Sequence, residues 1–368
     1  MPRFSRRSFL HLSAPASAAA AFKIATEPAL ALAARPAHPK DAVAIDSNEN
    51  PLGPSQGARE ALAAIIPQGG RYLDNLTDEL IQTFAAIEGL NPDCVHATAG
   101  STPPLILSVL AFTSDQKSYV TADPGFEAGM NIAPIAGSRV VKVPLTRSYA
   151  HDVKAMLAAA SDAGVFYICN PNNPTGTLTS HDDIEFLVAN KPKDSVVLVD
   201  EAYIHLSPAT SAIDLVKAGK DVIVLRTFSK AYGMAGLRCG LVIARPDLLE
   251  KIMARGGWNF MPVTALVAAI ASLKDSQLAP ERRRINAGVR KATFDWLDRN
   301  GYFYIPSESN CFLLETKRPG KEVREAMAKE NVLIGRTWPV MPTYVRVTVG
   351  TQAEMEKFQT AFQKVMKG

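Results

Sequence analysis

The chain has 368 residues, of which 47% are hydrophobic and 21% are charged. This length and balance exclude an intrinsically disordered protein and allow a sizeable core with more than one domain. The formal net charge is +4, and residues 1–34 hold four basic side chains against one acidic one. The rest of the chain is therefore close to neutral, which excludes the basic surface of a nucleic-acid-binding protein.

The first 34 residues have the composition of an export signal. Ser5–Leu10 reads S-R-R-S-F-L, a twin-arginine pattern, and a small, apolar, alanine-rich stretch covers residues 12–34. A-x-A cleavage sites occur at Ala29–Ala31 and Ala31–Ala33. We therefore predict a twin-arginine signal that sends the folded protein to the periplasm or beyond. The alternative is an amphipathic N-terminal helix on a cytoplasmic protein.

After residue 35 the pattern is that of an α/β fold. No apolar run there reaches the ~18 residues that a membrane span needs, so we expect no membrane segment once the signal is removed. Continuously apolar strands alternate with helices, which predicts a mostly parallel sheet covered on both faces. In chain order the prediction is an irregular segment at 46–55, a helix at 77–89, a helix opening after 100–102 and running through 105–110, strands at 117–121 and 139–143, a helix at 153–160, a strand at 165–169, a helix at 182–190, and strands at 195–200 and 221–226.

Beyond about residue 245 longer helices precede shorter strands, which is typical of a second, smaller α+β domain. The predicted elements are helices at 263–275 and 280–299, strands at 310–315 and 344–349, and a closing helix at 353–366. The predicted organisation is an export signal at 1–34, an N-terminal arm at 35–60 that joins the small domain, a large domain at 61–250 and a small domain at 251–368.

The four cysteines are widely spaced and have no metal-ligand spacing, so we predict no metal site. Cys169 and Cys311 lie inside apolar, strand-like runs. Export would permit a disulfide, but burial in strands favours free thiols.

Four motifs fall at or near the ends of predicted strands. Asn170–Gly176 reads N-P-N-N-P-T-G, Asp200–Tyr203 reads D-E-A-Y, and Thr227–Gly233 reads T-F-S-K-A-Y-G. Gly236–Gly240, G-L-R-C-G, follows shortly. Each alone is modest evidence, since such motifs also occur as plain turns and strand ends. Together, at the carboxyl edge of one parallel sheet, they predict a ligand site.

With these motifs the chain resembles the fold-type I, pyridoxal-5′-phosphate (PLP)-dependent aminotransferases of class I/II, and among them histidinol-phosphate aminotransferases most closely. The match runs from Asn48-Glu-Asn-Pro to Arg346-Val-Thr-Val-Gly-Thr351. The resemblance implies a seven-stranded-type, mostly parallel large-domain sheet with a smaller α+β domain, PLP as cofactor, and a homodimer with a shared active site. It also implies amino transfer from an amino acid or amino-alcohol phosphate donor to a 2-oxo acid, such as 2-oxoglutarate.

The resemblance assigns the chemistry to a few positions. Lys230 would hold the cofactor aldehyde as an imine and, once freed by substrate, move a proton between the substrate Cα and cofactor C4′. Asp200 would keep the pyridine nitrogen protonated, since a carboxylate favours a nearby cation. Asn173 and Tyr203 would donate to the phenolic oxygen, and Asn173 would also face the substrate.

The remaining cofactor contacts follow in the same way. The cofactor phosphate would lie at the helix N-terminus that opens at Ser101 and Thr102, where backbone N–H groups favour an anion. A plain N-cap role for Ser101 is the alternative. Ser229, Arg238 and Thr227 match the other phosphate anchors, Phe126 matches the aromatic ring that stacks on the pyridine, and Tyr72 resembles a tyrosine that reaches the phosphate from a neighbouring subunit.

Substrate recognition rests on two arginines and one departure from the family. Arg346 matches the arginine that binds the substrate carboxylate, where a bidentate guanidinium is suited to the task. Arg336 resembles a second arginine that helps bind the phosphate of histidinol phosphate. The family's tyrosine after Asn50-Pro51 is Leu52 here, and leucine cannot donate a hydrogen bond to that phosphate.

Three alternatives to this prediction remain. An aromatic or broad-specificity amino acid aminotransferase would use the same cofactor residues. A PLP-dependent decarboxylase or lyase, similar to threonine-phosphate decarboxylase, would also share them. A non-catalytic PLP-binding protein would lack part of the set, yet all of its members are present in the sequence.

Overall fold

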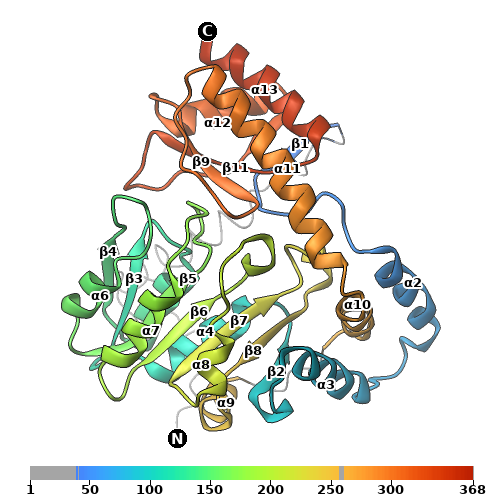
Figure 1. Cartoon of the computed structure of the whole chain (residues 1–368), viewed down its shortest axis with the longest axis vertical. Coiled ribbons are helices and arrows are strands. Elements are labelled where there is room, and N and C mark those ends of the chain that lie inside the picture. The colour runs from blue at the N-terminus through green and yellow to red at the C-terminus, as the bar shows by residue number, and fades with distance from the viewer. Residues whose placement is uncertain (1–38, 40, 257–260, 368) are drawn as a thin grey trace, which may run out of the picture. The chain divides into compact units, whose positions relative to one another are not determined.

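The computed structural model describes residues 39, 41–256 and 261–367. The chain divides into two units, Met1–Ala42 and Val43–Gly368. Only residues 39, 41 and 42 of the first unit are described, so the predicted export signal lies outside the described residues. Figure 1 labels the helices and strands of the second unit, which carries every motif discussed above except the signal.

A seven-stranded sheet forms the centre of this unit, as predicted. Its strand order is β2-β8-β7-β6-β5-β3-β4, and only β8 runs antiparallel to its neighbours. The three central strands β5, β6 and β7 are buried along their whole length, which explains their mostly apolar sequences. The bounds are β2 Val95–Thr98, β3 Ser118–Asp123, β4 Val140–Pro144, β5 Ala163–Cys169, β6 Val196–Asp200, β7 Val222–Thr227 and β8 Gly240–Ile243.

Helices cover both faces of this sheet and bury alternate strand side chains. On one face, Phe166 and Val197 belong to a core that takes in α2, α3, α6, α7, α8 and α10. On the other face, Tyr167 and Leu198 pack in a second core with α4, α5 and α9. The bounds are α2 Gln56–Ile65, α3 Asn75–Glu88, α4 Thr102–Phe112, α5 Ala128–Ile132, α6 Val153–Ala159, α7 His181–Asn190, α8 Ile213–Lys217, α9 Pro246–Met253 and α10 Val263–Lys274.

Local signals in the sequence set where several helices begin and end. The hydroxyl of Ser55 accepts a hydrogen bond from Ala58 N at the start of α2, and Ser180 caps α7 through Asp183 N. The carboxylate of Asp152 does the same for α6. Helix α3 ends at Gly89, whose left-handed backbone conformation suits glycine.

A second set of elements surrounds a separate core and agrees with the predicted α+β region. Strands β9 and β11 pair antiparallel, and β1 pairs parallel with β10, so residues of the N-terminal arm join the C-terminal third of the chain. In Figure 1 the long helix α11 runs from α10 to these strands. The domain boundaries proposed from the sequence stay predictions. The bounds are β1 Val43–Ile45, α11 Leu278–Arg299, β9 Cys311–Glu315, α12 Gly320–Lys329, β10 Val332–Ile334, β11 Tyr344–Thr348 and α13 Gln352–Lys367.

All four cysteines are free, and Cys169, Cys239 and Cys311 are buried, which confirms the sequence prediction of free thiols. Among the described residues, no helix combines the length and the apolar character that a membrane crossing requires.

The irregular segment that follows β1 is held against the loop that follows β7. Asn50 Nδ2 donates to the backbone oxygens of Lys230 and Ala231, each at 3.1 Å. Gly233 has φ +67°, and a Cβ there would collide with the backbone of Gly53. This close approach fixes the loop that carries Lys230.

We expect Gly233→Ala to destabilise the protein by on the order of 2 kcal/mol, because alanine must adopt a strained backbone conformation and also displace the Gly53 backbone. Urea-induced unfolding of the purified variant measures this loss. Gly236→Ala is the matched control in the same loop, because a Cβ at Gly236 meets open space and no positive φ is required. Equal unfolding midpoints for the two variants would contradict the expectation.

Candidate functional site

The motifs predicted to meet at the sheet edge lie side by side. The registers of β5, β6 and β7 align Cys169 with Asp200 and Asp200 with Leu225. The loops that leave these strands carry Asn173, Tyr203 and Lys230, so residues from three motifs reach the same place.

Asp200 is a buried carboxyl group at the end of β6, with 3% of the residue exposed. Tyr167 Oη donates to its Oδ2 at 2.9 Å, and Ala202 N donates to its Oδ1 at 3.1 Å. Burial nevertheless dominates and raises the pKa of Asp200 to about 6, although these two donors and Lys230 lower it. A carboxyl group poised in this way gains its charge readily when a cation comes to face it.

The Lys230 amine is also held in a buried position. Its Nζ donates to Asn48 O at 2.9 Å and lies 5.5 Å from the centroid of the Tyr203 ring. Burial, followed by the charge of Arg346, lowers the pKa of Lys230 to about 8. A larger fraction of this amine is therefore neutral and nucleophilic near neutral pH than for an ordinary lysine.

Asn48 organises this site, although sequence reasoning gave it no role there beyond marking where the resemblance starts. It has φ +53° and is 1% exposed. Its Nδ2 donates to Tyr203 Oη at 3.0 Å, and its backbone N donates to Thr348 Oγ1 at 2.9 Å. Asparagine adopts a positive φ more readily than most residues, so the N-E-N-P motif offered a usable signal.

A polar cradle lies where β7 and β8 face the start of α4. Arg238 Nη1 approaches Ser229 Oγ at 3.4 Å, and Thr227 Oγ1 donates to Ser229 Oγ at 2.9 Å. Gly100 has φ +92°, and a Cβ there would collide with the Arg238 guanidinium. Ser101 occupies the N-cap position of α4.

The alternative role predicted for Ser101 is wrong, because its side chain makes no capping hydrogen bond. The backbone already bends into the helix at Ser101, with φ −82° and ψ −15°, so its hydroxyl is not aimed at the N–H groups of the first turn as an extended N-cap would be. Thr102 is the first residue of α4, and prolines follow it in the first turn, where proline is tolerated.

Arg346 on β11 forms the opposite side of the site. Its Nη1 donates to Asn173 Oδ1 at 3.1 Å, and its Nη2 donates to Asp46 O at 2.6 Å. The residue is 8% exposed, yet its Nε has no hydrogen-bond partner among the described residues. A buried guanidinium with an unused donor is suited to an anionic ligand.

Arg336 lies next to Arg346 but has a different partner. The carboxylate of Glu127 forms an ion pair with its Nη2. Both guanidinium groups lie over the ring of Trp338, whose centroid is 4.7 Å from Arg336 Cζ and 5.8 Å from Arg346 Cζ. Sequence reasoning identified Arg336 but missed Glu127 and Trp338.

Two predicted cofactor residues stand outside these contacts. Phe126, in the loop between β3 and α5, is partly buried and packs against the core formed with α4 and α5. Tyr72 lies between α2 and α3 and is 74% exposed. The exposed tyrosine therefore has no part in the buried cluster around Lys230.

The residues present fit PLP. The cradle of Arg238, Ser229 and the α4 N-terminus offers positive charge and N–H groups to a phosphate, and Gly100 keeps the space beside Arg238 clear. Asp200 would hold the proton on the ring nitrogen, and the Lys230 amine would hold the aldehyde. When bound, PLP supplies an electron sink for bond cleavage at the substrate Cα.

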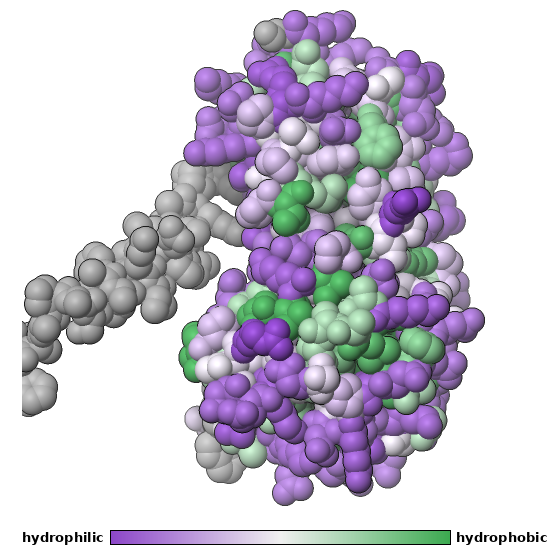
Figure 2. Space-filling view, turned by 90° about the vertical axis from the view of Figure 1, so that its left-hand side faces the viewer, coloured by the Kyte–Doolittle hydropathy of each residue, from purple (hydrophilic) through white to green (hydrophobic). Residues whose placement is uncertain are grey.

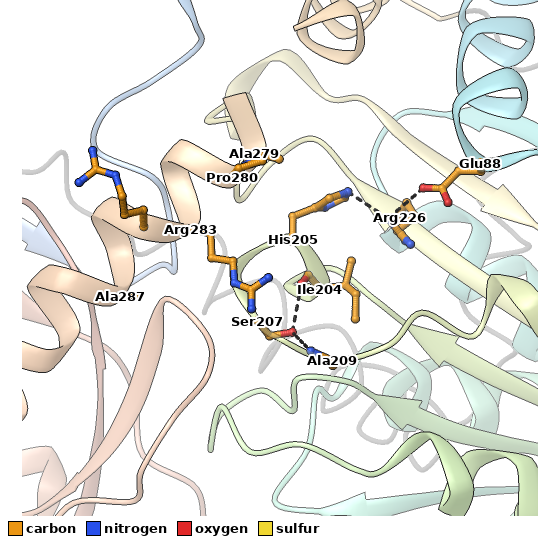
Figure 3. Close-up of a pocket in the computed structure, with 11 residues that line it drawn as sticks. Glu88, Ile204, His205, Ser207, Ala209, Arg226, Ala279, Pro280, Arg283 and Ala287 are labelled. Atoms are coloured by element: carbon orange, nitrogen blue, oxygen red, sulfur yellow. Dashed lines mark hydrogen bonds and ion pairs between the residues drawn. The ribbon is translucent and has the colours of Figure 1, made fainter. Parts of the chain in front are cut away.

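An open pocket of about 570 Å³ lies elsewhere, between the start of α11 and the turn Ile204–Leu206. Figure 3 shows His205 beside Arg226, with Glu88 beyond it. Arg226 is buried in an ion pair with Glu201 at 2.7 Å. Burial and the charge of Arg226 lower the pKa of His205 to about 3, so its neutral ring accepts a hydrogen bond. These contacts hold the loop after Tyr203 in place.

Comparisons with known proteins agree with this geometry. The family model described as aminotransferase class I and II matches residues 40–362. A histidinol-phosphate aminotransferase from Moorella thermoacetica is 32% identical over 89% of this chain and 86% of its own length. An aromatic amino acid aminotransferase from Cutibacterium acnes is 33% identical over 90% of this chain and 94% of its own.

Among solved structures, histidinol-phosphate aminotransferase from Sinorhizobium meliloti in complex with pyridoxal-5′-phosphate has the same fold, with a TM-score of 0.80 at 22% identity. The alignment covers 100% of this chain and 98% of that one.

We expect Asp200→Asn to change how the stability of the cofactor-free protein depends on pH. Because the folded pKa is raised from 3.8 to about 6, the folded chain binds more protons than the unfolded chain between these values. The contribution of this carboxyl to stability is present at low pH and is lost as the pH rises through about 6. From about pH 4 to about pH 7 the variant should gain on the order of 2 kcal/mol relative to wild type.

Urea unfolding of the two cofactor-free proteins across this pH range measures the difference. Added PLP should reverse the order near pH 7, because a cationic ring nitrogen facing Asp200 stabilises the carboxylate of the wild type. Stability curves that run parallel at every pH would contradict the burial that we assign to this group.

Proposed function

Because the chain belongs to the aminotransferase class I and II family and is a PLP-dependent enzyme similar to histidinol-phosphate aminotransferases, we propose that it moves the amino group of an amino acid with a neutral side chain to a 2-oxo acid, such as 2-oxoglutarate. The observation that carries this proposal is the buried guanidinium of Arg346. Its Nε has no hydrogen-bond partner among the described residues, its Nη1 donates to Asn173, and its charge acts on Lys230.

In this function the chain's own residues bind the donor and move its proton. Arg346 binds the α-carboxylate, which places Cα of the donor near Lys230. Lys230 Nζ, with a pKa of about 8, takes the proton from Cα as a general base and later returns a proton as an acid. Asn48 O, at 2.9 Å from Nζ, accepts a hydrogen bond from this amine and keeps it in place.

Histidinol phosphate is the second candidate donor. Relatives that carry that enzyme's name support it, and so does the presence of a second arginine, Arg336. Leu52 argues against it, because this exposed apolar side chain replaces the tyrosine that the resemblance leads one to expect. Aromatic and other neutral amino acids remain the preferred donors.

A donor screen on the purified PLP-loaded enzyme tests the proposal. We expect L-phenylalanine and similar amino acids to convert the cofactor to its amine form, followed by absorbance, and to yield glutamate when 2-oxoglutarate is present. Lys230→Ala should lower the rate by about 10⁴-fold or more, because it removes the nucleophile and the base together. Borohydride treatment of the loaded wild type should attach the cofactor to Lys230.

Release of CO₂ without glutamate would instead support the decarboxylase alternative. A rapid response to histidinol phosphate, with none to amino acids, would transfer the assignment to the second candidate.

We further propose a homodimer in which Tyr72 completes the site of the neighbouring subunit. Ile66 and Tyr72, both between α2 and α3, are 65% and 74% exposed. Exposed apolar side chains of this kind favour association with another chain. Figure 2 shows that hydrophobic residues also gather on the side of the molecule that lies at the left of Figure 1, away from α2 and α3.

If the site is shared, a Tyr72→Ala chain and a Lys230→Ala chain should complement each other. A mixed dimer contains one site with both side chains, so refolding the two variants together should give more activity than either variant alone. The matched control mixes Lys230→Ala with Ile135→Ala, another exposed apolar residue. No gain from the first mixture, in a protein that sediments as a dimer, would contradict the shared site.

We also propose that the enzyme is exported through the twin-arginine route. The sequence of residues 1–34 supports this, and a route that carries folded proteins suits an enzyme that must bind its cofactor first. Cell fractionation of the wild type and of a chain with Arg6 and Arg7 both changed to Lys measures the location. Equal distribution of the two forms would contradict export.

A further inference from the structure

We infer that Glu127 sets the charge at the anion-binding end of the site so that it accepts a donor with one negative charge and disfavours a phosphate monoester. This inference rests on the proposed function, since it concerns the donor of the same reaction. It makes Glu127 a specificity-determining residue.

The two arginines at this end belong to one local structure. Both guanidinium groups lie over the Trp338 ring, at 4.7 Å for Arg336 and 5.8 Å for Arg346. The buried indole is fixed in turn, because its Nε1 donates to Gly125 O at 3.3 Å. The charge of Arg336 therefore also acts on a ligand that binds to Arg346.

The two guanidinium groups differ in what they contact. Arg346 donates to two uncharged oxygens, Asn173 Oδ1 and Asp46 O, so its positive charge is not cancelled by these partners. Arg336 instead forms an ion pair with the carboxylate of Glu127. Of this pair of arginines, Arg346 is therefore the one with charge to offer an anion.

The charged side chains around this end of the site also favour a donor with a single negative charge. A third guanidinium, Arg324, is half-buried, and burial lowers its pKa; Asp46 and Glu325 raise it, while both other arginines lower it further. Three guanidinium groups thus meet three carboxylates, Asp46, Glu127 and Glu325. Because these carboxylates already balance the arginines, a phosphate monoester, which carries close to two negative charges at neutral pH, is matched less well than a singly charged α-carboxylate.

The position of Glu127 makes its effect on a ligand direct. Glu127 follows Phe126 in the loop between β3 and α5, and its side chain is 24% exposed. The Arg336 side chain is 45% exposed, so this ion pair is partly open to solvent and can be separated. A phosphate at Arg346 would have to displace the Glu127 carboxylate or lie near it, and like charges disfavour that arrangement.

L-histidine and histidinol phosphate are matched probes for this inference. They share the imidazole side chain and the Cα amine, and they differ in that Cα carries a carboxylate in one and a CH2 group esterified to phosphate in the other. We expect Glu127→Gln to shift the ratio of kcat/KM values toward histidinol phosphate by about tenfold or more, because Arg336 is released. Glu127→Asp should restore much of the wild-type ratio.

Asp162→Asn is the control variant, since it breaks an exposed ion pair with Arg139 at 2.9 Å on the sheet's β3 side and touches none of the site residues. In the double variant Glu127→Gln/Arg336→Met the shift toward the phosphate ester should disappear, which separates loss of the carboxylate from release of the arginine.

Calorimetric titration of the PLP-loaded enzyme with inorganic phosphate gives a second readout that needs no turnover. The Kd for phosphate should fall about tenfold in Glu127→Gln and stay at the wild-type value in Asp162→Asn. An unchanged phosphate Kd together with an unchanged substrate ratio would overturn the inference while leaving the proposed amino transfer intact. If no amino donor reacts with the wild type, the proposed function fails, and the phosphate titration still decides the role of Glu127.

Discussion

The site depends on the hydrogen bonds of one side chain and backbone, those of Asn48. This residue accepts from Lys230 Nζ, donates to Tyr203 Oη and contacts Thr348 at the end of β11. It thereby joins the irregular segment after β1, the edge of the large sheet and the C-terminal strands. The side-chain amide donates to Tyr203 and accepts from Thr348 Oγ1, while the backbone oxygen accepts from Lys230, in a backbone conformation that asparagine tolerates.

Burial shifts the pKa values of the two central ionisable groups in opposite directions, and both move toward neutral pH. Removal from water raises the pKa of Asp200 to about 6 and lowers that of Lys230 to about 8, because it disfavours the charged form of each. Both pKa values therefore lie within about one unit of neutral pH, where each group can gain or lose a proton readily. The bound cofactor brings the cationic ring nitrogen that Asp200 is placed to face.

Sequence reasoning predicted the large sheet and most of the buried cluster for a simple physical reason. Parallel strands end at one edge, so motifs that follow successive apolar runs must meet, as Asn173, Asp200 and Lys230 do. The antiparallel strand β8 was missed because it has only four residues and begins at Gly240, the last residue of the G-L-R-C-G motif.

The unforeseen contacts have a different cause. Tyr167 lies within an apolar strand and looked like core, although its hydroxyl binds Asp200. Glu127 is paired with a residue 209 positions away, and no local periodicity reports such a contact. Tertiary structure alone brings these partners together, so the sequence indicated the cofactor end and the two arginines of the donor end but not the carboxylate that pairs with Arg336.

The pairing of β1 with β10 affects the order in which the protein is completed. Residues 43–45 leave the ribosome early, but their partners at 332–334 are among the last to be made. Asn48 follows β1 closely and also bonds to Thr348. Its hydrogen bond with the Lys230 amine therefore cannot form until nearly the whole chain has been synthesised. A chain truncated before residue 332 would therefore contain Lys230 without the Asn48 contact that orients it. Only a complete chain would then hold the cofactor in the way described here.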